Sequence, residues 1–285
     1  MRRPTSTPSA PERHKPALGH LTLGPFSSPT PSKVSDLNLS TEFFMQRWPV
    51  LASPRASLVS SCCSGSSDLA TVARATEAAR SEAVLAARAL ASQGVKLLAL
   101  DFDLTLVTVH TRPCWTDGAA KLALFFRPEL VALIPAAAAV GISTAIVTFS
   151  TQTELIRESL AIAAGQSIAD AVIIRGEDGS WEPKHSPRTP TGAALTKTAH
   201  IESAAKEACR RAAAAAATPG MCPRGGEVAA VVPEKEAVLL LDDDFDNIEA
   251  ASKNGNRVHH VKSSYGGTGM LTELRHQLLL PRSAS

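Results

Sequence analysis

Two clusters of acidic residues have the types and the spacing to do chemistry. Asp101 and Asp103 are separated by one residue and directly follow the apolar run at residues 97–100. The second cluster follows the apolar run at residues 239–241 and consists of Asp242, Asp243 and Asp244. Carboxylates that point into one cleft repel each other, and a bound cation offsets that repulsion. Hard oxygen ligands of this kind suit Mg²⁺, which keeps several waters and bridges to a substrate phosphate.

Each cluster taken alone has a simpler explanation. A lone Asp-x-Asp is common, and a run of three aspartates is usually a solvated loop. An EF-hand calcium loop is excluded because its glycine and its terminal glutamate are missing around both clusters. Two clusters that each follow an apolar run directly are harder to explain without a bound cation, because gathered carboxylates are costly.

The elements that position these acids form an alternating pattern. Strands are expected at residues 95–100, 143–147, 171–174, 237–241 and 257–261. Helices are expected at residues 68–93, 119–140 and 197–217, and the second of these has a break at Arg127-Pro128. A capping box of Thr151 and Glu154 predicts that another helix starts there. Apolar strands separated by helices predict an α/β, Rossmann-like domain with a parallel sheet sandwiched by helices. Ligands bind such sheets beyond the carboxyl ends of the strands near the topological switch point, where both acidic clusters are expected.

Four segments in order along the chain resemble the motifs of the haloacid dehalogenase (HAD) superfamily. They are DFDLT at residues 101–105, AIVT at 145–148, a lysine, and LLLDDDFDN at 239–247, so that the resemblance covers roughly residues 95–265. It implies that Asp101 is the nucleophile that forms an aspartyl-phosphate, that Asp103 is the general acid and then the base, and that Thr148 hydrogen-bonds the phosphoryl group. It also implies Mg²⁺ as the cofactor, with a ligand set of Asp101, Asp103, Asp242 and Asp243. A carboxylate nucleophile splits hydrolysis into two easier steps, while a metal and a lysine neutralise the developing charge.

Three lysines compete for the place of the third motif: Lys184, Lys197 and Lys206. Lys197 is favoured because it opens a helix after a polar loop, and because residues 197–201 resemble the Lys-x-x-His run of some uncharacterised HAD-like proteins. Lys184 lies in a Pro-rich stretch, and Lys206 is better explained as a solvated helix residue. Near the second cluster, Asp246 is expected to support the metal without binding it, and Asn247 to cap the following helix.

The acid at Asp103 indicates the type of reaction. Dehalogenases resemble Asp-x-Tyr at this position, whereas Asp-x-Asp favours an oxygen leaving group and therefore a phosphatase. The segments 105–148 and 150–197 are too short for a separate cap domain, so we expect a minimal cap or none. Open sites of this kind resemble those that act on proteins or other bulky phosphates. The alternative is a non-catalytic HAD-fold binding or regulatory module, whose sign would be the loss of Asp101 or Asp103.

The composition bounds the remaining possibilities. The net charge of +2 is too small to indicate nucleic acid or an anionic membrane. The long uncharged stretch between Glu129 and Glu154 is interrupted by Pro135 and Gly141, and therefore predicts a buried helix and strand rather than a membrane span. Residues 1–66 are expected to form a disordered Ser/Pro-rich tail, and residues 67–285 the phosphohydrolase domain. The expected compartment is the cytoplasm, or an organelle if the tail is a transit peptide.

Overall fold

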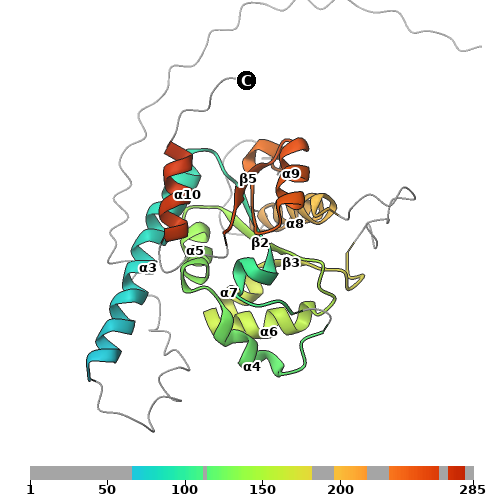
Figure 1. The fold of residues 1–285 in the computed structure, drawn as a ribbon. Helices are drawn as coiled ribbons and strands as arrows, with labels where there is room; N and C mark the ends of the chain where they lie inside the picture. The colour runs from blue at the N-terminus through green and yellow to red at the C-terminus, as the bar shows by residue number, and fades with distance from the viewer. Residues whose placement is uncertain (1–65, 112–113, 182–195, 217–230, 263–268, 280–285) are drawn as a thin grey trace, which may run out of the picture. The chain divides into compact units, whose positions relative to one another are not determined.

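A five-stranded, wholly parallel β-sheet forms the centre of the fold (Figure 1). Its strands are β1 (Leu97–Leu100), β2 (Ser143–Val147), β3 (Ile173–Arg175), β4 (Val238–Asp242) and β5 (Arg257–His260), in the order β3-β2-β1-β4-β5. Every residue of β1 and β4 is buried, as expected of strands covered on both faces. The prediction of an α/β fold with a buried parallel sheet is thereby confirmed.

The computed structural model describes residues 66–111, 114–181, 196–216, 231–262 and 269–279. The predicted tail lies outside these residues except for Ser66, where the first described helix begins. The helices are α3 (Ser66–Ser92), α4 (Gly118–Leu122), α5 (Pro128–Ala139), α6 (Thr153–Ala164), α7 (Gln166–Ala171), α8 (Thr198–Ala216), α9 (Phe245–Lys253) and α10 (Gly269–Leu279). Short turns of other helix types occur at Phe102–Leu106, Ala123–Phe125 and Lys235–Ala237.

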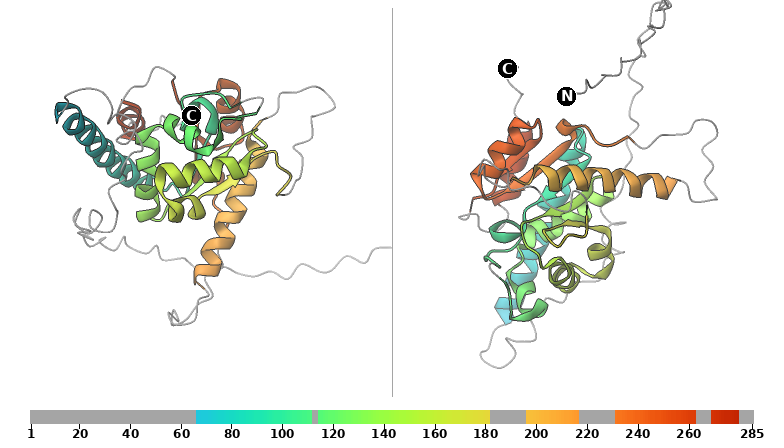
Figure 2. Two further views of the ribbon diagram at one scale, coloured as in Figure 1. Left: turned by 90° about the horizontal axis from the view of Figure 1, so that it is seen from below. Right: turned by 90° about the vertical axis from the view of Figure 1, so that its right-hand side faces the viewer.

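Helices pack on both faces of the sheet. Helices α8 and α9 pack on one face, where a buried core joins alternate strand residues such as Leu97 and Ala99 to Ile201 of α8 and Ile248 of α9. Helices α5 and α6 contact the other face, and α3 packs against α5 and α10 (Figure 1). The part of α8 nearest the sheet is buried, whereas its last five residues are exposed and project from the body (Figure 2).

The strand order places a switch point beside β1. From β1 the chain runs outward through β2 and β3, and it then returns to pair β4 with the other side of β1. Leu100 pairs with Ile146 on one side and with Leu241 on the other. Because the strands are parallel and in this register, the residues that follow them emerge together at one edge of the sheet.

Two local predictions are wrong. The capping box of Thr151 and Glu154 does not form, since α6 begins at Thr153 and its N-cap residue is Gln152. The Gln152 side chain instead holds the backbone of Trp115, accepting from its N–H at 2.8 Å and donating to its carbonyl at 3.1 Å. The third strand was predicted at residues 171–174, but Ala171 ends α7 and the strand begins at Ile173. Alanine favours helix, and local composition does not reveal where a short helix ends.

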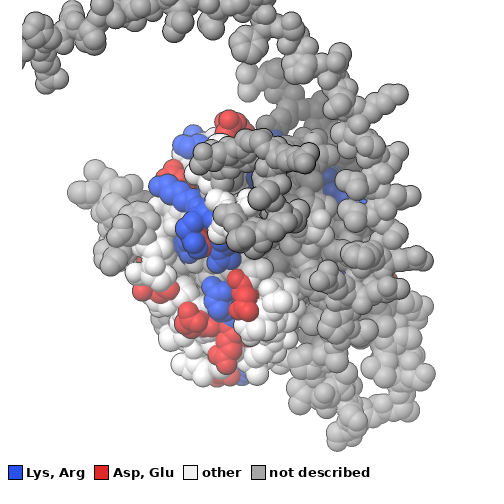
Figure 3. Space-filling model, turned by 180° about the vertical axis from the view of Figure 1, so that it is seen from behind, with Lys and Arg blue, Asp and Glu red and all other residues white. Residues whose placement is uncertain are grey.

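The uncharged stretch between Glu129 and Glu154 forms α5 followed by β2, as predicted. No helix within the described ranges is long and apolar enough to cross a membrane. Lysine and arginine side chains lie among aspartates and glutamates on the face shown in Figure 3. Cys114, in the loop before α4, is an exposed free thiol.

Candidate active site

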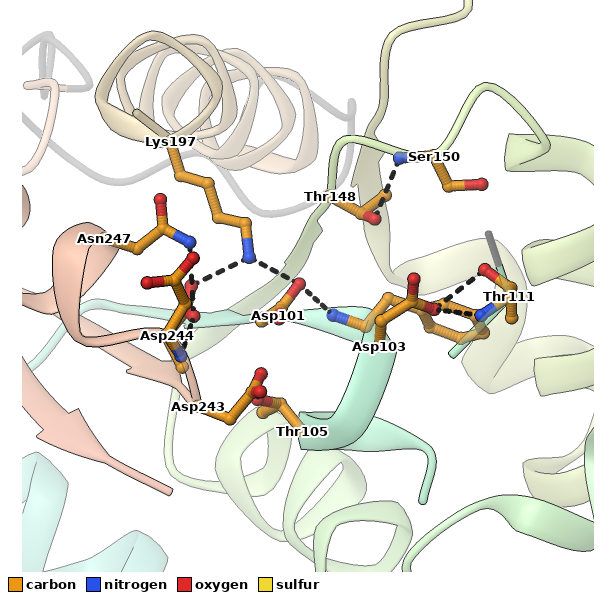
Figure 4. Close-up of polar contacts among 12 residues, drawn as sticks. Asp101, Asp103, Thr105, Thr111, Thr148, Ser150, Lys197, Asp243, Asp244 and Asn247 are labelled. Atoms are coloured by element: carbon orange, nitrogen blue, oxygen red, sulfur yellow. Dashed lines mark hydrogen bonds and ion pairs between the residues drawn. The ribbon is translucent and has the colours of Figure 1, made fainter. Parts of the chain in front are cut away.

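Three carboxylates meet at the carboxyl edge of the sheet, where β1 and β4 lie side by side (Figure 4). One oxygen from each of Asp101, Asp242 and Asp243 lies within 4.8 Å of the others. Asp101 directly follows β1, and its N–H donates to the carbonyl of Leu241 in β4 at 2.9 Å. The sheet hydrogen bonding therefore fixes these carboxylates next to one another at the switch point.

Lys197 bridges two of the three carboxylates. Its Nζ lies 2.5 Å from Oδ1 of Asp101 and 2.8 Å from Oδ2 of Asp242, and the residue is only 3% exposed. Lys197 immediately precedes α8, and its carbonyl accepts from the N–H of Ile201 at 3.0 Å, so that the helix anchors its backbone. Of its two competitors, Lys206 is exposed on α8 and Lys184 lies outside the described residues.

The group carries an excess of buried negative charge. Burial raises the pKa of Asp101 well above its ordinary value; the Lys197 ammonium opposes this rise, and Asp242 adds to it. Burial also raises the pKa of Asp242. Burial alone would lower the pKa of Lys197, but the two carboxylates outweigh it and raise that pKa, so the ammonium stays charged. One ammonium does not balance three ionised carboxylates, and a bound cation would supply the missing positive charge.

The donor set fits Mg²⁺. Three carboxylates provide hard oxygen ligands and leave coordination positions for water and for a phosphate, which is the arrangement that Mg²⁺ favours. Neighbouring donors orient two of them. Thr105 Oγ1 donates to Asp243 at 3.1 Å, and Asn247 donates to Oδ1 of Asp242 at 3.3 Å. Hydrogen bonds of this kind fix the direction of a ligand and tune its affinity for the metal.

The role expected of Asn247, after the second cluster, is wrong. Asn247 does not cap α9, because the N-cap residue is Asp244, whose Oδ1 accepts from the N–H of Asp246 at 2.9 Å. The Asn247 amide points back to Asp242 instead. Asp246 is exposed in the first turn of the helix, where a negative charge is favourable.

Asp103 lies apart from the three clustered carboxylates. Its Oδ1 accepts from the hydroxyl of Thr111 at 2.7 Å and from the N–H of Thr111 at 3.1 Å (Figure 4). Nδ1 of His110, an exposed residue, is 3.9 Å from Oδ2. Asp103, expected to be a metal ligand, is not in the group whose oxygens lie within 4.8 Å. Nothing in the sequence singled out Thr111, which reaches Asp103 only through the course of the loop.

The turn that carries Asp101 and Asp103 has an unusual backbone. Residues Phe102–Leu106 form a tight turn whose backbone departs from helical geometry at Asp103, with φ of −66° and ψ of 133°, and at Leu104. Leu104 within it has φ of 57°, which is unfavourable for a residue with a Cβ and costs about 1–3 kcal/mol. Buried Arg127 stabilises the turn by donating from Nη2 to the carbonyl of Leu104 at 3.1 Å. The sequence predicts a helix boundary at Arg127 but does not reveal this hydrogen bond.

Thr148 lies at the carboxyl end of β2, next to β1, and is 2% exposed. Its Oγ1 accepts from the N–H of Ser150 at 3.1 Å, so that its own hydroxyl hydrogen can be donated elsewhere. Gly176, in the loop after β3, packs closely against Ser150, in the loop after β2. A Cβ added to Gly176 would lie 2.5 Å from the carbonyl oxygen of Ser150. The loops after β2 and β3 are thus held together beside the carboxylates.

Comparison with protein-family models, with curated proteins and with solved structures finds no match to this chain. The fold and the site therefore define only a structural class for this chain. The chain has a parallel α/β sheet with a buried site of carboxylates and one lysine at its switch point.

Proposed function

We propose that this chain is a Mg²⁺-dependent phosphatase of the HAD type, which hydrolyses a phosphate monoester through an aspartyl-phosphate on Asp101. The observation that carries the proposal is the buried contact of Lys197 with Asp101 and Asp242, beside Asp243 at the switch point of the sheet. Asp101, Asp242 and Asp243 would hold the metal. When bound, Mg²⁺ supplies positive charge that offsets the charge of the transferring phosphoryl group.

Asp101 acts as the nucleophile. One of its carboxylate oxygens bonds to phosphorus as the ester P–O bond breaks, and the leaving oxygen takes a proton from Asp103. A water oxygen then bonds to phosphorus, Asp103 takes a proton from that water, and the Asp101–phosphorus bond breaks to release inorganic phosphate. The Lys197 ammonium favours the ionised, reactive form of Asp101, because it opposes the rise in pKa that burial causes.

Thr148 and Asp103 complete the reaction. The Thr148 hydroxyl, which accepts from Ser150, donates its hydrogen to a phosphoryl oxygen. Asp103 must turn from Thr111 toward the leaving oxygen, a change of side-chain rotamer within the turn that follows Asp101. Catalytic groups are often poorly aligned before substrate binds, so this geometry is compatible with an acid–base role.

The substrate is a protein or another bulky phosphate. All strands within the described ranges belong to one sheet, and the described elements between β1 and β2 are short turns, α4, and α5, which packs on that sheet. These features support a site with a minimal cap or none, which admits a large substrate.

The test is turnover of an aryl phosphate with and without Mg²⁺, using wild type and Asp101→Asn. Turnover that needs both Mg²⁺ and Asp101 supports the proposal, and its absence contradicts it. The alternative, a non-catalytic HAD-fold binding or regulatory module, is favoured by one observation: the Asp103 carboxylate is hydrogen-bonded to Thr111 rather than directed at the clustered acids. Mg²⁺ binding by calorimetry without turnover of any phosphate in a phosphopeptide and phosphometabolite panel would indicate that alternative.

A further inference from the structure

Two aromatic side chains from separate segments contact the ring of His200, and one of them also contacts Lys197. Phe149 follows β2, Trp181 lies in the segment after β3, and His200 is in α8. The His200 ring is 5.6 Å from the Phe149 ring at an interplanar angle of 83°, and 4.7 Å from the Trp181 ring at 57°. His200 is fully buried, and Trp181 is 8% exposed. The buried imidazole therefore contacts two larger rings.

Packing alone does not account for a histidine at this position. Among the residues that the structure describes, neither ring nitrogen of His200 has a hydrogen-bond partner, although the side chain is completely buried. Burial of an unpartnered polar group is unfavourable, and an apolar side chain such as leucine would avoid that cost. Burial, with a smaller contribution from the Lys197 charge, lowers the pKa of His200 to about 4, so the ring is neutral at neutral pH. What histidine offers here is a small, flat, uncharged ring.

Phe149 connects that ring to the site. The Lys197 Nζ lies 5.4 Å from the centroid of the Phe149 ring, within the range of a cation–π contact. The ammonium thus has Asp101 and Asp242 on one side and an aromatic face on another. A lysine side chain has four rotatable bonds, so an ammonium is held in one place only when it is restrained from several directions.

We propose that His200 is a positioning residue, which holds the Phe149 ring against the ammonium of Lys197 and so fixes that ammonium between Asp101 and Asp242. Trp181 also contacts the imidazole, and its Nε1 donates to the carbonyl of Gly176 at 2.5 Å, which anchors it to the loop after β3. The effect of this arrangement on rate rests on the proposed function, whereas the position of Lys197 does not.

The position is tested by NMR on the full chain with ¹³C-labelled lysine. The ε-CH₂ resonance of Lys197 is assigned by its loss in Lys197→Met, and the face of the Phe149 ring should displace it upfield of the exposed Lys206. Phe149→Leu and His200→Leu should move it toward the Lys206 position, while Phe149→Tyr, which keeps the ring, should leave it in place. An unchanged resonance in His200→Leu would overturn the proposal. Should that variant lack a cooperative melting transition, His200→Gln, which also removes the ring, is measured in its place with the same two outcomes.

The rate is tested by a double-mutant cycle on aryl phosphate turnover. His200→Leu should lower kcat about tenfold, because small misplacements of a catalytic group are costly, and should change KM less than about twofold. In the Phe149→Leu background the same substitution should have little further effect, since His200 acts through Phe149. Equal losses in both backgrounds would show a merely structural role and refute the proposal. If the resonance shifts as expected but wild type has no Mg²⁺-dependent turnover, the positioning stands and the proposed function fails.

Discussion

Replacement of Lys197 by methionine removes the ammonium while keeping most of the apolar stem of the side chain. Lys197 is 3% exposed and contacts Asp101 and Asp242 at 2.5 and 2.8 Å, so it is a fixed electrostatic group in a buried site. Loss of one such preorganised group lowers kcat by about 10²–10³-fold in comparable sites. We therefore expect Lys197→Met to reduce kcat for an aryl phosphate by roughly 10²-fold or more.

The same substitution should lower stability in a pH-dependent way. Breaking a buried ion pair by removing one partner costs about 3–5 kcal/mol, and a loss of 3 kcal/mol corresponds to roughly 6–12 °C in Tm for a domain of this size. Without the ammonium, the pKa values of Asp101 and Asp242 rise further above those of the unfolded chain. A carboxyl group whose pKa is raised by folding loses its stabilising contribution as the pH rises through the folded pKa. The deficit in Tm should therefore be large at pH 8 and small near pH 5.

Both effects are measured with one matched control. Lys206→Met alters an exposed lysine on the same helix and should leave kcat and Tm near wild type. Thermal melts are recorded without Mg²⁺ at pH 5 and pH 8, because a bound cation would partly replace the missing charge. A wild-type rate in Lys197→Met, or a Tm deficit that does not change with pH, would refute the electrostatic argument. Loss of single-turnover activity in Lys184→Ala but not in Lys197→Met would assign the catalytic role to Lys184.

Other predictions concern the acids and one loop. Asp101→Asn should abolish turnover while the melting transition is retained, and a wild-type-like rate would exclude Asp101 as the nucleophile. Asp242→Ala and Asp243→Ala should weaken Mg²⁺ binding strongly in a calorimetric titration and Asp244→Ala much less; equal affinities in all three would remove the proposed metal site. Gly176→Ala should lower Tm, because the new Cβ would meet a backbone oxygen at 2.5 Å, and an unchanged melt would contradict that packing.

The sheet and its acidic edge were predictable because each depends on local patterns. An apolar run that ends abruptly in Asp101 or Asp242 signals a buried strand whose carboxyl end meets polar groups. Boundaries were less predictable where a short helix meets a strand, as at Ala171, because local composition does not show where the helix ends. The start of α6 was misjudged since Gln152 makes its bonds to Trp115, 37 residues away in the sequence.

The orientation of polar side chains could not be predicted either, because it also depends on contacts between residues far apart in the sequence. Thr105 and Asn247 lie within the segments that resemble HAD motifs, but the motifs do not show where these side chains point. The hydrogen bond of Thr105 to Asp243 depends on the pairing of β1 with β4. The direction of Asp103 toward Thr111 depends on the irregular turn after Asp101, and no local pattern in the sequence predicts that turn. The ring contacts of His200 with Phe149 and Trp181 join three segments that only the folded sheet brings together.

The strand order also governs when the site can form as the chain folds. β1 lies at the centre of the sheet, but its neighbour β4 follows α8 late in the chain, and the Thr105–Asp243 contact joins residues 138 apart. Until β4 has been synthesised and docked, one side of β1 is an open strand edge, which can pair with other chains. Contacts between such distant residues also slow folding. During synthesis, the step that brings Asp242 and Asp243 beside Asp101 is therefore also the step that covers this open edge of β1.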